Sequence, residues 1–360
     1  MKGRDGTLVK SQRRRLASTL FLVAAITTTV LMLGHLKSPE CFGEQKVIKL
    51  KLAEQLSPTH YFSREGGQYW MKQVKEVTNE RVQFQHFPGE QLSKGLDMLN
   101  TLSNRVADAG YIVCSYFASK MPLISGASLL ANFRDNESGT RAIWAVVNRK
   151  TVLETEFLKN GIRPVLMFSN PAFQIWTTKN HVKKAADIKG MKIGSTGGVQ
   201  DMILKSWGAI PVQIPMPEVY EALQRGTLDG KLISSASVHA YRLEEVCKFE
   251  TGVNVDGGAV GYVMSEKTWQ SLPADIKNSI KRVSDEAVAR IGKVLDGEAK
   301  SWRAQFIKQG ISTYDPTPEE MKEWSDLRKP VLDEWLKKMA DQRLPGKEVL
   351  EELLVKAGKS

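Results

Sequence analysis

Apolar and polar positions follow a strand–helix–strand order in the first part of the chain. Apolar residues alternate with polar ones over 47–55 and 82–87, which predicts two strands, and residues 61–78 between them carry apolar positions at helical spacing. A turn, a helix and a third strand are predicted over 88–113. Strands that alternate with helices in this way form a parallel or mixed sheet with helices on its faces.

The same order recurs in the second half. The predicted elements are strands at 162–170 and 173–178, a second strand–turn–helix run that opens at KGMKIGSTGG (189–198), a strand at 212–217 and a helix at 218–230. In both halves an apolar helix precedes a turn with Gly or Asn, then an Asp, then a crossing strand. We therefore predict an α/β protein with two similar lobes.

The chain becomes mostly helical after a strand predicted at 259–265. Residues 273–310 predict one nearly continuous helix, which at 1.5 Å per residue would be roughly 55 Å long. Such a helix is longer than one lobe is wide. It must therefore span both lobes or break, and Gly292 and Gly297 are its weakest positions.

These patterns suggest a division of the chain. We expect lobe I over 44–171 plus about 260–290, lobe II over 172–259 plus about 300–360, and the long helix over 273–310. A chain of 360 residues that is 42% hydrophobic is long enough and apolar enough for two domains.

The N-terminus carries an export signal. Three arginines at 13–15 precede an apolar run over 16–36 and a polar stretch, which is typical of a signal peptide cleaved near residue 43. The run also has about the length of a membrane span, so an uncleaved N-terminal anchor is the alternative for residues 1–43. In either case we expect the body outside the cytoplasm, in the periplasm.

Composition and motifs exclude several function classes. The formal net charge is +11, but residues 1–43 hold seven Lys/Arg against two acids, and the remaining charges are interspersed, so no nucleic-acid partner is expected. The patterns GxxxxGK[ST], GxSxG, HExxH and CxxC do not occur. Cys114 and Cys247 are isolated. We therefore expect no enzyme, metal or cofactor, although an enzyme that binds phosphate at the 194–198 turn stays a competing hypothesis.

Several stretches together resemble a known family. The segments DIKGMKIGSTGG (187–198) and GAIPVQIPMPEVYEALQRGTLDG (208–230) resemble the DctP-like solute-binding subunits of TRAP transporters, and PGEQLSKGLDML (88–99) and WQSLPADI (269–276) match as well. The resemblance covers roughly 48–345.

The resemblance implies a fold and a function. The fold would be a two-lobed, class II-like periplasmic-binding-protein fold in which a long helix bridges both lobes. The protein would capture a small solute between the lobes, an organic acid or a related polar or aromatic compound, and deliver it to the membrane subunits of a TRAP permease. The alternative is a membrane-anchored ligand-sensing domain of the same fold. A monomer is expected, with a dimer as the alternative.

The sequence departs from the family pattern where the ligand is usually held. The resemblance implies that the family usually has an Arg, which binds the ligand carboxylate, at the position of Gly194. Some members have a second Arg at the position of Gln174, and a family Asn falls at the position of Ile233. The ligand is therefore either an acid held without this arginine or a neutral compound. Candidates for a displaced cation, each of which could instead be a surface charge, are Lys231, Arg242 and Lys179.

Further candidate ligand-binding residues follow from the ends of the predicted strands, because ligands of open α/β sheets bind beyond the carboxyl ends. Gln55 and His60 follow the first strand, and Ser234 and Ser235 occupy the matching place in the second lobe. In the turn, Gly194, Ser195, Thr196 and Gly197 form either a neutral anion nest or a plain turn into the next helix.

Three aromatic residues complete the candidate site. Tyr111 and Tyr116 flank the third strand, where ligand contacts are expected, and Trp176 lies near the hinge strand. Each is either a ligand contact or a core residue, and the sequence leaves both interpretations open.

Overall fold

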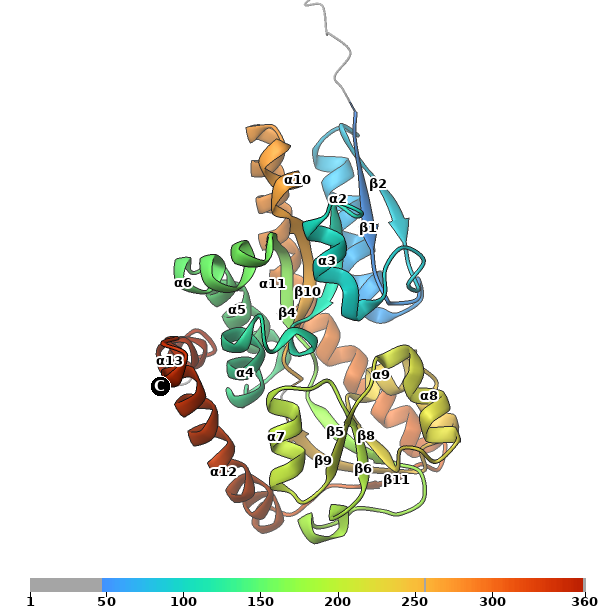
Figure 1. Ribbon diagram of the computed structural model, residues 1–360. Helices are drawn as coiled ribbons and strands as arrows, with labels where there is room; N and C mark the ends of the chain where they lie inside the picture. Colours follow the sequence, from blue (N-terminus) through green and yellow to red (C-terminus); the bar gives the residue numbers. More distant parts are fainter. Residues whose placement is uncertain (1–46, 256, 359–360) are drawn as a thin grey trace, which may run out of the picture. The chain divides into compact units, whose positions relative to one another are not determined.

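The computed structural model describes residues 47–255 and 257–358. Its strands form two separate sheets (Figure 1). The first has the order β2-β1-β3-β10-β4, and β10 runs antiparallel to both of its neighbours. Its strands are β1 (Ile48–Ala53), β2 (Val82–Phe87), β3 (Ala109–Val113), β4 (Ile162–Ser169) and β10 (Ala259–Ser265). The mixed sheet predicted from the strand–helix alternation is confirmed.

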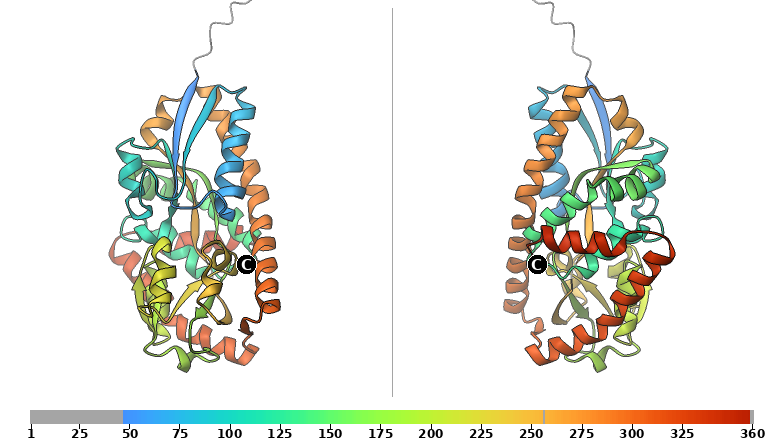
Figure 2. Two further views of the ribbon diagram at one scale, coloured as in Figure 1. Left: turned by 90° about the vertical axis from the view of Figure 1, so that its right-hand side faces the viewer. Right: turned by 90° about the vertical axis from the view of Figure 1, so that its left-hand side faces the viewer.

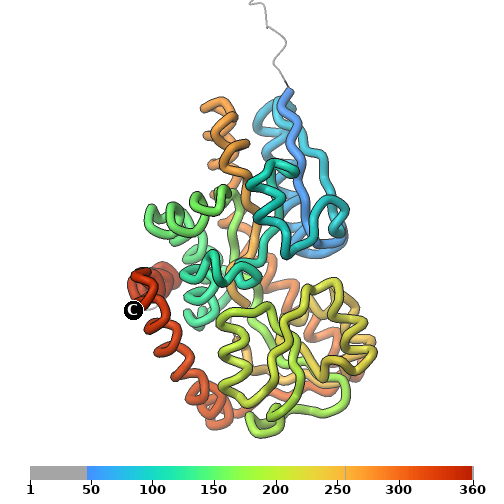
Figure 3. Tube along the Cα trace, viewed as in Figure 1, coloured from blue at the N-terminus to red at the C-terminus, as the bar shows by residue number. Residues whose placement is uncertain are grey.

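The second sheet has the order β11-β9-β5-β8-β6-β7. Its strands are β5 (Phe173–Thr177), β6 (Lys192–Ser195), β7 (Ile210–Gln213), β8 (Gly230–Ile233), β9 (Phe249–Val255) and β11 (Ser312–Tyr314). The chain passes from β4 of the first sheet to β5 of the second and returns from β9 to β10. These two short crossings join the two lobes, which Figure 3 shows as the upper and lower parts of the trace.

Helices accompany both sheets. They are α2 (Tyr69–Val77), α3 (Met98–Ser103), α4 (Pro122–Leu130), α5 (Asn136–Val147), α6 (Lys150–Val152), α7 (Val199–Ser206), α8 (Met216–Gln224), α9 (Ser235–Ala240) and α10 (Glu266–Ser271). A π-helical turn, η1 (Ser63–Gln68), leads into α2, and a 3-10 turn, η3 (Cys114–Phe117), follows β3. The predicted helix at 218–230 is shorter than expected, because it ends at Gln224 and Gly226 turns the chain with a φ of 71°.

The predicted long helix is confirmed as α11 (Ala274–Lys308), which has 35 residues. Its first part contacts α2, α5 and β4 beside the first sheet, and the helix runs on along both lobes (Figure 2). In its last part, Phe306 packs against Trp176 of the second lobe. It does not break at Gly292. A Cβ there would lie 2.7 Å from the Cα of Glu137, so glycine permits the close approach of α11 to the start of α5.

The C-terminal segment consists of α12 (Pro318–Asp341), which continues through Pro330, and α13 (Gly346–Lys356). Helix α12 contacts α7 and α4, and α13 contacts α4 and α5. The end of the chain, which we expected with lobe II, therefore packs on helices of the segment expected in lobe I. The lobe limits themselves stay a prediction.

The sequence also raised points about the termini, thiols and metals. The predicted leader at 1–43 lies outside the described residues. Within 47–255 and 257–358, no helix combines the length and apolar character needed to cross a membrane. In the same part of the chain, no cluster of His, Cys, Asp or Glu is arranged to hold a metal ion. Cys114 and Cys247 are buried free thiols.

Candidate functional site

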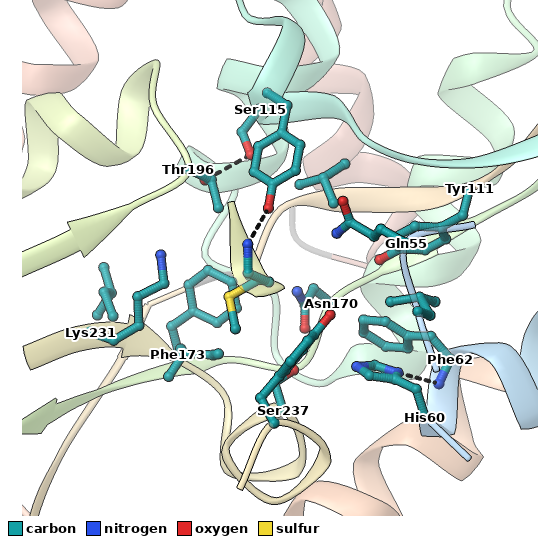
Figure 4. Close-up of a pocket in the computed structure, with 18 residues that line it drawn as sticks. Gln55, His60, Phe62, Tyr111, Ser115, Asn170, Phe173, Thr196, Lys231 and Ser237 are labelled. Carbon is teal, nitrogen blue, oxygen red and sulfur yellow. Dashed lines mark hydrogen bonds between the residues drawn. The ribbon is translucent and has the colours of Figure 1, made fainter. Parts of the chain in front are cut away.

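A small pocket lies between the two lobes. Its walls come from the carboxyl ends of β1 and β3 in the first sheet, from β8 and the start of α8 in the second lobe, and from the crossing at 170–173 (Figure 4). It offers about 40 Å³ to the centres of water molecules, which is room for roughly three of them. A pocket of this size and place is suited to a small solute.

Lys231 is the buried cation of the pocket. It lies in the middle of β8, paired in register with Gly194 of β6 and Trp176 of β5, and its side chain is 1% exposed. Among the described residues its Nζ has no hydrogen-bond partner. Burial lowers the pKa of Lys231 to about 7, and the charge of Asp201 opposes this shift. A buried amine without a partner is costly, because the ammonium loses its water and gains nothing in return.

The glycine at position 194 makes room for this lysine. A Cβ on Gly194 would lie 2.8 Å from Cδ of Lys231 and 3.1 Å from Cδ1 of Leu228. Any side chain at position 194 would therefore displace the stem of Lys231. The lysine on the neighbouring strand occupies the space beside the position where the resemblance places an arginine.

His60 contributes a hydrogen-bond donor on another wall. It is 2% exposed, and burial lowers its pKa to about 3, so its ring is neutral at ordinary pH. The backbone N–H of Phe62 donates to Nδ1 of His60 at 3.1 Å. The proton of the neutral ring must then be on Nε2. Within the described part of the chain, Nε2 has no partner.

Gln55 is a further polar residue of the pocket lining. Its side chain is 5% exposed, and its Oε1 has no partner among residues 47–255 and 257–358. The amide is fixed in place by packing, because a Cβ on Gly95 would lie only 1.6 Å from Oε1. It also interacts with the hydroxyl of Tyr116. Oε1 of Gln55 is therefore packed against Gly95.

The remaining wall is largely apolar and aromatic. The aromatic lining residues are Phe62, Tyr111, Tyr116, Phe173 and Tyr241. Burial raises the pKa of Tyr111 well above its usual value and that of Tyr116 to about 12, so both hydroxyls stay protonated. Aromatic walls with a few oriented polar groups are typical of small-molecule sites.

Hydrogen bonds between the lobes close the pocket. The hydroxyls of Tyr61 and Ser237 are 2.8 Å apart, and Ser115 donates to Thr196 at 2.8 Å. The backbone N–H of Met216 donates to the hydroxyl of Tyr116 at 3.2 Å. Each bond joins a segment near the first sheet to one near the second. The structure therefore represents a closed arrangement of the lobes.

The structure brings part of the predicted site together. The predicted residues that line the pocket are Gln55, His60, Tyr111, Tyr116, Thr196 and Lys231. Those that do not line it, although all lie in the described part of the chain, are Gln174, Trp176, Gly194, Ser195, Gly197, Ser234 and Ser235. Of the three candidate cations, Lys231 is buried, whereas Lys179 and Arg242 are exposed, and Arg242 pairs with Glu245.

The turn after β6 uses two of its N–H groups within the protein. The N–H of Thr196 donates to Oε1 of Gln200 at 2.6 Å, and the N–H of Gly197 donates to Oγ of Ser195 at 3.2 Å. Ser195 in turn donates to Asp201. These two N–H groups are therefore not free to hold an anion, which favours the plain turn into the next helix.

Other predicted site residues make contacts within the protein. Trp176 packs edge-on against Phe306 of α11 at 5.4 Å between ring centroids, in a core behind the sheet. The amide of Gln174 donates to Asn254 at 3.0 Å. Ser234 is the N-cap of α9 and accepts from the N–H of Ser237. Ser235 donates to Gln174.

Sequence reasoning missed several lining residues, among them Phe62, Ser115, Asn170, Phe173, Met216, Ser237 and Tyr241. Asn170 and Phe173 flank the β4–β5 crossing. The position of this crossing between two predicted strands was the one feature of the sequence that could have indicated these two residues, because a hinge borders the cleft between lobes. Tyr241 follows α9 and reaches the ring of His60 at 5.2 Å, a contact across 181 residues that no local pattern indicates.

Comparison with known proteins decides the family. The model of the family DctP, bacterial extracellular solute-binding protein family 7, matches residues 52–338. The chain belongs to this family. It is an extracytoplasmic solute-binding protein of the TRAP type, and the two-lobed fold expected from the sequence resemblance is confirmed.

Individual relatives agree with this assignment. The C4-dicarboxylate-binding periplasmic protein DctP of Rhodobacter capsulatus is 23% identical over 280 residues, 75% of this chain and 81% of its own length. A TRAP solute-binding protein of Rhodoferax ferrireducens, solved with copurified benzoate, matches at a TM-score of 0.81 and 21% identity, covering 87% of this chain and 98% of that one. A marine metagenome protein solved with 3-hydroxybenzoate matches at a TM-score of 0.81 and 20% identity, covering 87% of this chain and 98% of that one.

Proposed function

We propose that this DctP-family protein captures a small monocarboxylate with an apolar body, held by Lys231, and delivers it to a TRAP permease. The observation that carries the proposal is the ammonium of Lys231, 1% exposed and without a hydrogen-bond partner in the described part of the chain. A ligand carboxylate would supply the missing countercharge. Charge-assisted N–H···O bonds are about twice as strong as neutral ones.

The alternative of a neutral ligand fits the pocket less well. A neutral solute without a hydrogen-bonding group at this end would leave Nζ of Lys231 buried and without a partner, whether the amine is charged or neutral. Asp201 is not a direct partner of Lys231, because Nζ has no hydrogen bond within the described residues, and Oδ1 of Asp201 accepts from the hydroxyl of Ser195. The charge balance therefore favours an anion.

The rest of the ligand is inferred from the walls. Five aromatic side chains and a cavity of about 40 Å³ favour a compact apolar body. Solved relatives with benzoate and 3-hydroxybenzoate bound support this size class at the level of the fold. A single carboxylate is expected, because Lys231 is the one Lys or Arg among the lining residues that the structure describes.

The permease, the location and the absence of catalysis belong to the same proposal. Closure of the lobes over the ligand would create the surface that docks on the membrane subunits, because a ligand that binds the closed state better shifts the population toward it. The protein would act in the periplasm after export. It would release its ligand chemically unchanged. The turn that could have held phosphate uses the N–H groups of Thr196 and Gly197 within the protein, which speaks against a phosphate-binding enzyme.

Calorimetry with benzoate, short aliphatic acids and their neutral amides tests the proposal. We expect wild type to bind acids but not amides, and Lys231→Met to weaken acid binding by about 10- to 150-fold, the value of a hydrogen bond to a charged group. Lys192→Met is the matched control, because Lys192 is an exposed lysine of the same sheet. Equal binding of acids by wild type and Lys231→Met would refute the proposal.

A further inference from the structure

Resting on that function, we infer that the hydroxyl of Tyr116 is the second donor to the ligand carboxylate, beside Lys231, and that closure of the lobes orients it. Lys231 comes from β8 of the second sheet, whereas Tyr116 lies in η3, directly after β3 of the first sheet. Both residues line the same pocket of about 40 Å³. Each lobe then contributes one donor to the same anion.

The hydroxyl of Tyr116 accepts a hydrogen bond and has a proton left to donate. The backbone N–H of Met216 donates to its oxygen at 3.2 Å. Burial raises the pKa of Tyr116 to about 12, while the N–H of Met216 and the side chain of Gln55 oppose this shift, as donors to the oxygen do. Because an N–H can only donate, the proton of the hydroxyl needs a different partner.

The protein itself offers this proton no acceptor within residues 47–255 and 257–358. Oε1 of Gln55 has no partner there and is packed against Gly95. The hydroxyl of Thr196, another lining group, accepts from Ser115 at 2.8 Å and donates to Gln200 at 3.1 Å. The proton of Tyr116 is therefore available to a ligand.

Two donors without acceptors determine which head group the pocket prefers. Nζ of Lys231 and the hydroxyl of Tyr116 both require an oxygen that accepts. A carboxylate has two oxygens with about four acceptor sites and no proton of its own. A carboxamide of the same shape has one oxygen, and its NH2 group would face one of the two donors. The pair of donors therefore distinguishes an acid from its amide.

Closure of the lobes prepares the hydroxyl for this role. Met216 begins α8 in the second lobe, so the bond from its N–H to Tyr116 joins the lobes. Opening breaks this bond and leaves the hydroxyl free to rotate about its C–O bond. A carboxylate that uses the oriented hydroxyl binds the closed state better, which is the condition for a ligand to shift the lobes toward closure.

Tyr116→Phe tests the inference, because it removes the hydroxyl and keeps the ring. In calorimetry of the whole protein with benzoate and butyrate at pH 6, we expect the dissociation constants to rise about tenfold or more, the value of a hydrogen bond to a charged group. The same variant loses the contact with Met216. Tyr61→Phe is therefore the matched control, since Tyr61 joins the lobes through Ser237 and does not line the pocket.

Infrared spectroscopy of bound benzoate, labelled with ¹³C at the carboxylate, separates ligand contact from lobe closure. Hydrogen bonds to the two oxygens set the frequency of the antisymmetric carboxylate stretch. At saturating benzoate we expect this band to shift in Tyr116→Phe. It should keep its wild-type position in Tyr61→Phe, because the hydroxyl of Tyr61 bonds to Ser237 on the other lobe.

The outcomes separate the inference from the function on which it rests. If the acids bind wild type but the band of Tyr116→Phe stays at the wild-type position, the inference is overturned and the function stands, even where affinity falls. An equal shift in Tyr116→Phe and Tyr61→Phe also overturns it, because lobe closure then explains the band. If neither acid binds wild type, the proposed function fails, and the inference fails with it.

Discussion

Carboxylate affinity should fall steeply with pH above neutrality, because the cation of the pocket is a titratable lysine. In the empty protein burial lowers the pKa of Lys231 to about 7. A bound carboxylate would hold the lysine in its charged form, so binding above this pKa must take up a proton. A family member that uses arginine would show no such dependence, since the guanidinium stays charged.

The size of the effect follows from the pKa. About 90% of empty molecules carry the charge at pH 6 and about 3% at pH 8.5, so the dissociation constant should rise about 30-fold over this range. The other ionisable lining groups keep their protonation state between pH 6 and pH 8.5. The pKa of His60 is about 3 and that of Tyr116 about 12, and burial raises the pKa values of Tyr111 and Tyr241. The charge of Asp201 on α7 raises the pKa of Lys231 and so opposes the larger effect of burial.

Calorimetry in buffers of different ionisation enthalpy measures both the affinity and the proton uptake. We expect uptake of nearly one proton per ligand at pH 8.5 and little at pH 6. Lys231→Arg serves as the comparison and should bind without proton uptake wherever it binds. A dissociation constant that is constant from pH 6 to pH 8.5 in wild type, with no proton uptake, would refute the reasoning.

Three further predictions follow from the same contacts. Gly194→Arg should weaken carboxylate binding at least tenfold in calorimetry, because its Cβ would lie 2.8 Å from Cδ of Lys231, and unchanged affinity would contradict this placement. Tyr61→Phe removes the bond to Ser237, worth about 1 kcal/mol, and should weaken binding about fivefold by favouring the open state, visible as a larger radius of gyration in X-ray scattering. Burial raises the pKa of Glu156 from 4.5 to about 7, so the folded state holds its proton more tightly than the unfolded state. The contribution of Glu156 to the free energy of unfolding should therefore be largest below pH 4.5 and fall by roughly 3 kcal/mol up to pH 7, measured in urea titrations as the difference between wild type and Glu156→Gln.

Much of the fold could be predicted because its signals are local. Alternation and helical spacing identify β1, β2 and α2, and the length of the apolar pattern at 273–310 identifies α11 as a bridge. The path of α13 could not be predicted, since its contacts with α4 and α5 join segments about 200 residues apart.

The site was less predictable, because its main feature depends on register. Lys231 and Gly194 are 37 residues apart and meet because β6 and β8 pair in parallel. Only this pairing shows that the lysine is buried and that the glycine accommodates its stem. The turn at 194–198 shows the same limit, because its N–H groups are used by Gln200 and Ser195 in a way the residue types leave open.

A structure of the protein with the ligand that it carries through purification, identified by mass spectrometry, tests the central claim most directly. The account predicts a small monocarboxylate whose oxygens lie about 2.7–2.9 Å from Nζ of Lys231. A neutral ligand, or a carboxylate bound away from Lys231, would contradict it.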